Sequence, residues 1–394
     1  MRYNYNFKQS LLVVTCTTIL SIPTYANADH TEAHVEGEGI QFKQGDIQYE
    51  LGGRIVFDYD RFYGVYENDT DKAGRGTELR RGRVYIKGAL NKDWQSKLQV
   101  EINDEKQNAQ FKDLYVKYKG LKWAELMIGK AKEPFGLEMI ASTKFLAPIE
   151  RATISDAFAP SRSYGITLLT QFNQTTFAGG IYAEDPDEGH QETFALTGRI
   201  TYAPIMTQNA TLHLGIAGSY RDLGGNDHQI KKTAEVHLAH QLITSQEITA
   251  TNNVNLLGVE AAAIFGPFSF QTEYMSVHVD TESNSDYQPA NYDGYYAQAS
   301  YFLTGETYSY KKGYLDKFIP SSAQNVWQLF TRFSHIDTIG NEAGVEADNM
   351  TFGVNYYPNL QIRISANYIM TDITNADATE DDGKAFSLRF QYLF

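Results

Sequence analysis

The feature that most constrains this chain is an alternation of apolar and polar residues that recurs from about residue 49 to the C-terminus. In 96–104 (SKLQVEIND), Leu98, Val100 and Ile102 share one face, and polar side chains occupy the other. A period of two is the property of a β-strand whose two faces meet different surroundings. The chain is therefore predicted to be built almost entirely from strands with one apolar and one polar face.

Sixteen segments follow this pattern. Many have ten or more residues, whereas strands of soluble sheets usually have about 5–6. The count is good to about two strands, because 235–243 could be an additional strand and 305–324 stands where a short turn is expected. The segments are 49–59, 78–89, 94–104, 110–119, 124–132, 164–172, 175–184, 193–203, 210–221, 254–264, 267–279, 292–304, 325–337, 347–357, 360–372 and 385–394.

The connections between these segments alternate in length. Short turns such as 173–174 and 358–359 alternate with long polar loops such as 133–163 and 222–253. Alternating short and long connections with an even strand number are typical of an outer-membrane barrel. No apolar run after the first 28 residues approaches the roughly 18 residues of a transmembrane helix. We therefore predict an all-β fold, a transmembrane antiparallel β-barrel of about 16 strands. The alternative, a secreted β-sandwich, fits the strand length and the continuous apolar face less well.

The N-terminal residues have the pattern of a secretory signal peptide. Arg2 and Lys8 precede the short apolar run 11–20, and small residues follow it at 26–28. This arrangement is typical of a cleaved export signal. We expect cleavage after Ala28, with Ala26 as the alternative position.

Cysteine usage agrees with export. The only cysteine, Cys16, lies inside the predicted signal, and Thr15 before it disfavours a lipoprotein signal. The mature chain then has no disulfide and depends on strand pairing and packing. The predicted organisation is a signal peptide at 1–28, a short periplasmic segment at 29–48 and a barrel at 49–394.

The charged residues of 78–90 (ELRRGRVYIKGAL) indicate which face meets lipid. Arg81, Arg83 and Lys87 share one face, and the other face carries small or apolar residues. An Arg or Lys on the lipid side costs about 2–4 kcal/mol near the bilayer midplane, so we place the basic face in the lumen. Arg80 falls on the apolar face near the strand end, where its side chain could reach water or headgroups.

The polar faces of other strands add further cations, although the chain has 34 Lys and Arg against 48 Asp and Glu. The acidic excess lies mostly in loops such as 280–286 and 376–382. Rings of Arg or Lys bias a pore toward anions. The alternative is that these residues only brace the wall through pairs with carboxylates. The lumenal cations assigned in this way are Arg54, Arg199, Arg221, Arg332, Arg363, Arg389, Lys97 and Lys117.

Several blocks of the chain resemble the phosphate-selective porins O and P. The similarity runs from about residue 50 to the C-terminus and is densest in GGRIVFDYDRF (52–62), ELRRGRVYIKGALNKDWQSKLQVEI (78–102), IGKAKEPFGLE (128–138) and ERATISDAFAPSRSYGI (150–166). The resemblance implies a homotrimeric sixteen-stranded channel of the Gram-negative outer membrane. It also implies that Phe394 is the C-terminal signal read by the outer-membrane assembly machinery.

The resemblance further implies which residues select the solute. The cluster Arg80, Arg81 and Arg83 would line the pore, and the loop 133–163 would fold inward and narrow it. Lys144 and Arg151 correspond to basic residues at that constriction. One departure concerns 231–242 (KKTAEVHLAHQL), where phosphate-specific members carry alternating arginines and this chain has none. We therefore expect an anion preference with modest or different substrate selectivity.

Other chemistry is not indicated by the sequence. The chain contains neither the G-x-S-x-G nor the H-E-x-x-H pattern, so it is not expected to be an enzyme. His30 and His34 could bind a metal only if they were helical and had further ligands. No cofactor and no nucleic-acid partner are expected.

The sequence thus predicts an outer-membrane porin for passive diffusion of small anions, with phosphate and polyphosphate as candidates. Arg81, Arg83, Lys144 and Arg151 would select the anion, with Arg54 and Lys87 supporting the field. Outer-membrane lipid and lipopolysaccharide would surround the barrel. The alternatives are a general-diffusion porin with little selectivity, and a non-conducting barrel that acts as adhesin, enzyme or anchor.

Overall fold

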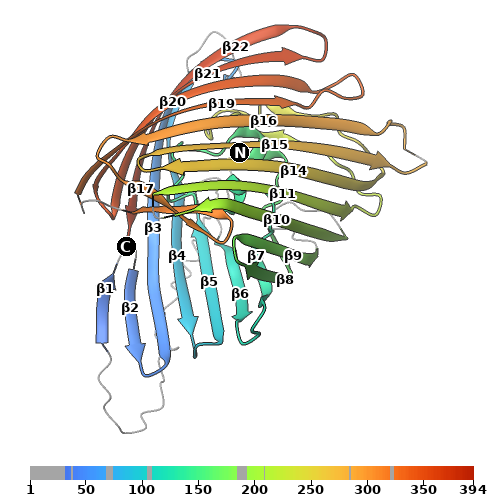
Figure 1. The fold of residues 1–394 in the computed structure, drawn as a ribbon. Helices are drawn as coiled ribbons and strands as arrows, with labels where there is room; N and C mark the ends of the chain where they lie inside the picture. The colour runs from blue at the N-terminus through green and yellow to red at the C-terminus, as the bar shows by residue number, and fades with distance from the viewer. Residues whose placement is uncertain are drawn as a thin grey trace, which may run out of the picture.

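A computed structural model describes residues 32–36, 39–67, 74–103, 109–183, 193–207, 209–283, 285–319 and 324–394. The predicted signal peptide, 1–28, lies outside these residues. The described chain forms a closed antiparallel barrel of sixteen strands, in which each strand pairs with the next and β22 pairs with β3 (Figure 1). The barrel strands are β3 (Ile47–Gly64), β4 (Gly74–Ala89), β5 (Trp94–Ile102), β6 (Gln110–Tyr118), β7 (Glu125–Lys132), β8 (Arg162–Phe172), β9 (Thr175–Ala183), β10 (Phe194–Met206), β11 (Ala210–Asp222), β14 (Thr251–Phe265), β15 (Phe268–Thr281), β16 (Ala290–Phe302), β19 (Gln324–Asp337), β20 (Val345–Asn359), β21 (Ile362–Asn375) and β22 (Glu380–Leu393).

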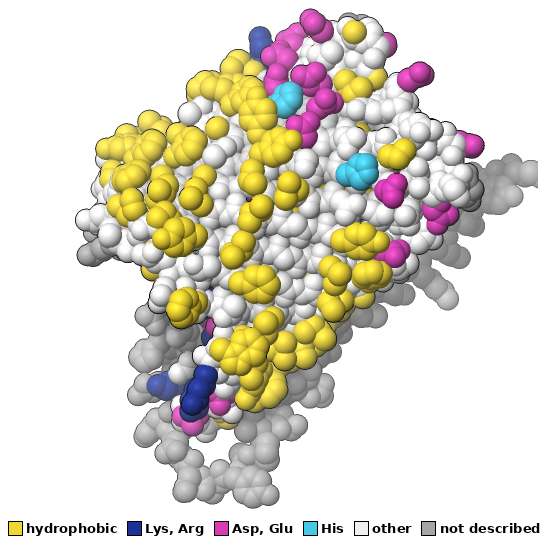
Figure 2. All heavy atoms as spheres, turned by 45° about the vertical axis from the view of Figure 1, so that its right-hand side comes forward, with side chains coloured by type: hydrophobic (Ala, Val, Ile, Leu, Met, Phe, Trp, Pro, Cys, Tyr) yellow, Lys and Arg dark blue, Asp and Glu magenta, His cyan; other side chains and the backbone are white. Residues whose placement is uncertain are grey.

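All sixteen predicted segments are confirmed as these strands, and the side-chain alternation separates the two faces of the wall. In β21, for example, Arg363 and Ser365 are buried on the inner face, whereas Ile364 and Tyr368 are exposed on the outer face. Figure 2 shows hydrophobic side chains spread over one outer face, with Asp and Glu gathered toward its upper and right-hand edges. Within the described ranges, no helix is both long and apolar enough to cross a membrane.

The two ends of the barrel differ. Short connections such as 90–93, 173–174 and 266–267 define what we call the turn end, and long connections such as 133–161 and 223–250 define the loop end. The strand pair β1 (Glu32–Glu36) and β2 (Gly39–Gln44) continues from the beginning of β3 at the turn end. The periplasmic position of 29–48 and the start of the barrel domain at 49 stay predictions.

Three segments occupy part of the interior of the barrel. Segment 133–161 carries the short helices α1 (Leu137–Ile140) and α2 (Thr153–Ala157), and segment 223–250 carries the strand pair β12 (Lys231–Lys232) and β13 (Ile243–Thr244). Both belong to the largest apolar cluster, which includes Phe158, Val236 and Ile248. From the turn end, the hairpin β17 (Thr307–Lys311) and β18 (Tyr314–Ile319) contributes Leu315 to a second cluster with Leu137.

Two uncertainties of the sequence pattern are thereby resolved. Residues 235–243 do not form an additional barrel strand, because Glu235 has a positive φ of 63° and its neighbours Ala234 and Val236 pack against other interior segments. The stretch 305–324 is not a plain turn, because most of it forms the β17–β18 hairpin. The even strand number is therefore preserved.

Candidate functional site

Segment 133–161 is held at both ends of α1. The Glu273 carboxylate on β15 accepts hydrogen bonds from the backbone N–H groups of Leu137 at 2.7 Å and Glu138 at 2.8 Å. The Lys132 ammonium donates to the backbone carbonyls of residues 139–141 at 2.7, 3.1 and 2.7 Å. These side chains satisfy the amide and carbonyl groups that a short helix leaves without intrahelical partners. The segment is therefore fixed within the barrel.

Arginines from the opposite wall hold the rest of the same segment. Arg332 pairs with Glu138 at 3.3 Å, and both side chains are almost fully buried. Arg363 and Arg389 donate to backbone carbonyls within 147–149. These three lumenal cations brace the segment. Arg332 and Arg389 also pair with carboxylates, as in the wall-bracing alternative, whereas Arg363 acts through backbone carbonyls and neighbouring amide and hydroxyl groups.

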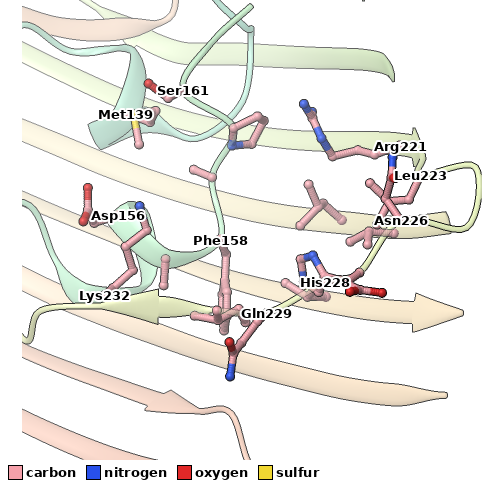
Figure 3. Close-up of a pocket in the computed structure, with 18 of the residues that line it drawn as sticks. Met139, Asp156, Phe158, Ser161, Arg221, Leu223, Asn226, His228, Gln229 and Lys232 are labelled. Carbon is pink, nitrogen blue, oxygen red and sulfur yellow. The ribbon is translucent and has the colours of Figure 1, made fainter. Parts of the chain in front are cut away.

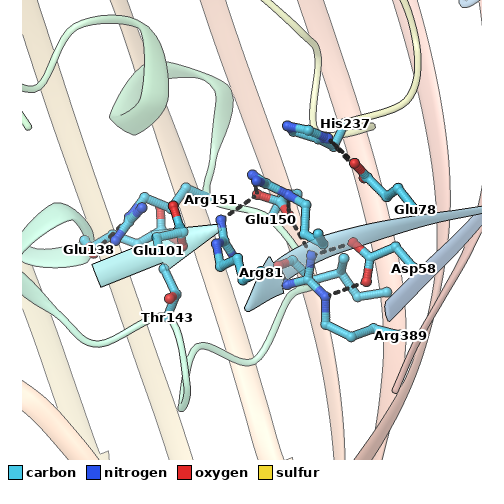
Figure 4. A network of polar contacts seen from close by, with 12 residues as sticks. Asp58, Glu78, Arg81, Glu101, Glu138, Thr143, Glu150, Arg151, His237 and Arg389 are labelled. Atoms are coloured by element: carbon cyan, nitrogen blue, oxygen red, sulfur yellow. Dashed lines mark hydrogen bonds and ion pairs between the residues drawn. The ribbon is translucent and has the colours of Figure 1, made fainter. Parts of the chain in front are cut away.

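The predicted arginine cluster meets the tip of this segment. Arg80 donates through Nε and Nη2 to the two carboxylate oxygens of Glu150, both at 3.0 Å, and Arg81 lies 3.5 Å from the same carboxylate (Figure 4). Burial opposes ionisation of Glu150, but the guanidinium groups of Arg80, Arg81 and Arg389 outweigh it and hold its pKa well below its ordinary value. Arg83 is paired with Glu101 on β5.

The position of Arg80 differs from the one that strict alternation gives. The register between β3 and β4 shifts after the pair Val56 and Arg81, and the next pair is Phe57 with Leu79. Arg80 is the additional residue of this β-bulge, and a bulge redirects the side chain that it carries. The guanidinium therefore points to Glu150 inside the barrel and not to water or headgroups outside it.

Arg54 is the least neutralised member of the cluster. It lies on β3 opposite Arg83 and is only 2% exposed. Its Nη2 donates to the Thr143 hydroxyl at 2.7 Å, whereas its Nε and Nη1 have no hydrogen-bond partner among the residues that the structure describes. A buried guanidinium with unused donors is costly unless an anion or water satisfies it.

The other predicted residues lie close by. The Lys144 ammonium is 5.0 Å from the centre of the Tyr85 ring, and Lys87 pairs with Glu50 at 2.6 Å. Arg151 donates weakly to backbone carbonyls of α1, at 3.3 and 3.4 Å. The structure therefore brings together cations from strands on one side and from segment 133–161 on the other.

These cations line a cavity of about 520 Å³. Its lining contains eleven Lys and Arg residues but only two carboxylates, Asp113 and Asp316. Six predicted site residues line it, and Arg80 does not. Sequence reasoning missed Lys132, Arg162, Lys311 and Lys317 as site residues. These residues lie in connections between barrel strands or at strand ends, where the alternation of apolar and polar residues does not predict which side chains face the lumen. The basic residues are Arg54, Arg81, Arg83, Lys87, Lys97, Lys132, Lys144, Arg151, Arg162, Lys311 and Lys317.

A second cavity of about 630 Å³ lies toward the loop end, where Arg221, His228 and Lys232 line it (Figure 3). It shares Arg151 and Arg162 with the first cavity. Its lining is more balanced, with four Lys and Arg residues against three carboxylates. Arg221 in this lining is held by Glu133 at 3.0 and 3.1 Å. The cavity toward the loop end, which we call the mixed vestibule, thus adjoins the strongly basic cavity through the two arginines that they share.

Segment 231–242 presents few cations to this vestibule. Lys232 lines it, but Glu235 is buried against Arg332 and accepts hydrogen bonds from strand hydroxyl groups at 2.8 and 2.9 Å. His237 contacts Glu78 at 2.8 Å. Segment 231–242 is therefore held against the barrel wall by acidic and histidine side chains.

No group of three or more metal-ligating side chains occurs among the described residues. His30 lies outside them, and residues 32–36 form strand β1, so the helical spacing considered for His30 and His34 is not adopted at His34.

Comparisons with known proteins agree with this architecture. The family model "Phosphate-selective porin O and P" matches residues 49–394. Porin O of Pseudomonas aeruginosa is 28% identical, and the match covers 89% of each chain. An anion-selective porin from Comamonas acidovorans has a similar fold, with a TM-score of 0.55 at 12% identity over 88% of this chain and all of that one. The outer-membrane channel DcaP of Acinetobacter baumannii gives 0.58 at 12% identity over 89% and 99%.

Proposed function

The chain belongs to the phosphate-selective porin O and P family, which makes it an outer-membrane porin, and from this premise we propose how it selects small anions. The solute enters the mixed vestibule at the loop end, passes Arg151 and Arg162, and crosses the basic cavity toward the turn end. Segment 133–161 forms the constriction. Arg54, Arg81 and Lys144 contact the anion there, and Arg83, Lys87 and Arg151 contribute to the positive field.

The observation that carries this proposal is the charge of the inner cavity. Eleven basic side chains face two carboxylates in its lining, and two guanidinium nitrogens of Arg54, Nε and Nη1, have no hydrogen-bond partner among the described residues. Guanidinium groups bind phosphate-like oxyanions through a planar fork of donors. In a water-filled pathway each such contact would be screened, so the anion would be admitted without being held.

A general-diffusion porin with little selectivity is the second candidate. It is favoured by the neutralisation of Arg80 by Glu150 and of Arg83 by Glu101, which reduces the number of cations free to meet a solute. We infer from this pairing an anion preference without high phosphate specificity.

The partners follow from the same proposal. The barrel would be exported by the signal at 1–28, assembled through recognition of Phe394, and inserted as a homotrimer among lipid and lipopolysaccharide. Phe394 is also paired with Gly53, N–H to carbonyl in both directions at 2.7 and 3.1 Å, where the barrel closes. Chemical crosslinking of the native protein in the membrane tests the trimer: products no larger than a monomer would contradict it.

The decisive experiment is the reversal potential in a planar bilayer under a KCl gradient, repeated with added phosphate and with Arg81→Ala/Arg83→Ala. We expect chloride selectivity in the wild type, inhibition of the current by phosphate, and weaker selectivity in the double variant. Cation selectivity of the wild type would contradict the proposed anion channel. Selectivity that did not depend on the arginines would mean that they only brace the wall.

A further inference from the structure

The carboxylate of Glu150 occupies an unusual place, because it is shared by three arginines from strands on either side of β3 (Figure 4). One oxygen accepts from Arg80 Nε at 3.0 Å and from Arg389 Nη2 at 2.5 Å. The other accepts from Arg80 Nη2 at 3.0 Å and lies 3.5 Å from Arg81 Nη2. The backbone carbonyl of Glu150 is itself held by Arg332 at 3.1 Å. The tip of segment 133–161 thus presents a fixed internal anion to the arginine cluster.

The three arginines that line the basic cavity differ in how far a protein carboxylate neutralises them. Arg83 forms a close ion pair with Glu101, and Arg54 forms none among the described residues. Arg81 is intermediate, because its contact with Glu150 is the longest of the carboxylate's contacts with its three arginines. A long ion pair is the easiest of these to exchange for a competing anion, since at 3.5 Å it lacks the close hydrogen bonds that Arg80 and Arg389 donate to the same carboxylate.

We propose that Glu150 is a specificity-determining residue of the channel: its carboxylate competes with a permeating oxyanion for the Arg81 guanidinium and thereby keeps anion binding weak. This inference rests on the proposed anion-conducting function. A guanidinium binds a carboxylate and a phosphate-like oxyanion through the same donors, so whatever fraction of Arg81 is engaged by Glu150 is withdrawn from the solute. Weak binding favours release, which a conducting channel requires.

The test is the concentration of inorganic phosphate that halves the chloride current of the purified porin in a planar bilayer. Glu150→Gln keeps the shape of the side chain but removes its charge. We expect the half-blocking concentration to fall about tenfold, which corresponds to one charge-assisted hydrogen bond gained by the anion. Asp316→Asn is the matched control, because Asp316 lines the same cavity and has no ion pair within the described part of the chain.

A second comparison separates competition for Arg81 from a general loss of negative charge or a loosened loop. In an Arg81→Ala background, Glu150→Gln should change the half-blocking concentration by much less than in the wild type. Equal effects of Glu150→Gln and Asp316→Asn, or an undiminished effect without Arg81, would overturn the inference. Glu150→Asp keeps the charge but retracts the oxygens, so it should shift the block in the same direction by a smaller factor even if Glu150→Gln assembles poorly.

This outcome is distinct from failure of the proposed function. A wild-type channel that is cation-selective in a KCl gradient would contradict the proposed function whatever Glu150 does. An anion-selective wild type whose phosphate block is unchanged by Glu150→Gln would contradict only the role of Glu150.

Discussion

Arg54 provides the sharpest test of how the cavity attracts anions, because its charge faces the lumen with the least compensation. Replacing it with methionine removes one guanidinium but keeps most of the apolar stem. The structural loss is small, since within the described part of the chain the Arg54 side chain forms only the hydrogen bond to Thr143, and a bond of this kind contributes about 0.5–1.5 kcal/mol. The variant should therefore fold and keep segment 133–161 in place.

The electrostatic loss is larger. An anion about 4 Å from a cation gains about 1 kcal/mol at the dielectric constant of bulk water and about 4 kcal/mol at an effective value near 20. Taking the lower figure as the minimum gain, 1 kcal/mol corresponds to about a fivefold change in an equilibrium ratio. We therefore expect Arg54→Met to lower the chloride-to-potassium permeability ratio about fivefold.

The assay is the reversal potential of single channels under a KCl gradient. Arg61→Met is the matched control, because Arg61 belongs to the same strand and is exposed, with its guanidinium over the ring of Tyr63. The control should leave the permeability ratio unchanged. Equal ratios for the wild type and Arg54→Met would refute the argument that unpaired positive charge at this position drives selection.

Three further variants test how the interior is held in place. Arg332→Met leaves two buried carboxylates without their cation, which costs about 3–5 kcal/mol; the folded band on unheated gels should disappear at a lower temperature, and an unchanged transition would contradict the bracing role. Tyr310→Phe removes the 2.7 Å hydrogen bond to His213, so the β17–β18 hairpin should be less fixed and the open-channel current noisier, whereas unaltered noise would argue against this anchor. Burial and the nearby Arg221 lower the pKa of His228 from 6.5 to about 4. Between these values the folded state binds fewer protons than the unfolded state, so stability falls as pH drops, and His228→Gln should abolish that part of the pH dependence of the gel transition.

The strands were predictable because each has to present an apolar face to lipid and a polar face to the lumen. This requirement repeats in every strand, so an alternation such as that of 360–372 is sufficient to assign both the element and its orientation. The exception is Arg80, where one additional residue in β4 breaks the alternation. A bulge is a local change of register, and no periodic pattern records it.

The interior segments were much less predictable. The stretch 305–324 has neither alternation nor helical periodicity, and its hairpin is held by contacts distant in the sequence, such as Arg199 with the Gly313 carbonyl at 2.6 Å. The same holds for Glu235, whose partner Arg332 is 97 residues away. Contacts of this kind form only when the barrel is closed, because closure sets the distance between opposite walls. The local sequence of a loop does not contain that distance, so it does not predict the contacts.

The pairing of charges also explains how so many cations can line one cavity. Many of its cations have a carboxylate close by, as Lys87 has Glu50, Arg83 has Glu101, and both Lys97 and Arg162 have Asp113. These carboxylates are needed for the stability of the fold, because a buried charge without a partner raises the free energy of the folded state by several kcal/mol. Of the four carboxylates that pair with Lys87, Arg83, Lys97, Arg162 and Arg81, only Asp113 lines the cavity itself. The ion pairs therefore stabilise the lumen while the lining of the cavity stays mostly positive, and a solute that entered it would meet mainly guanidinium and ammonium groups.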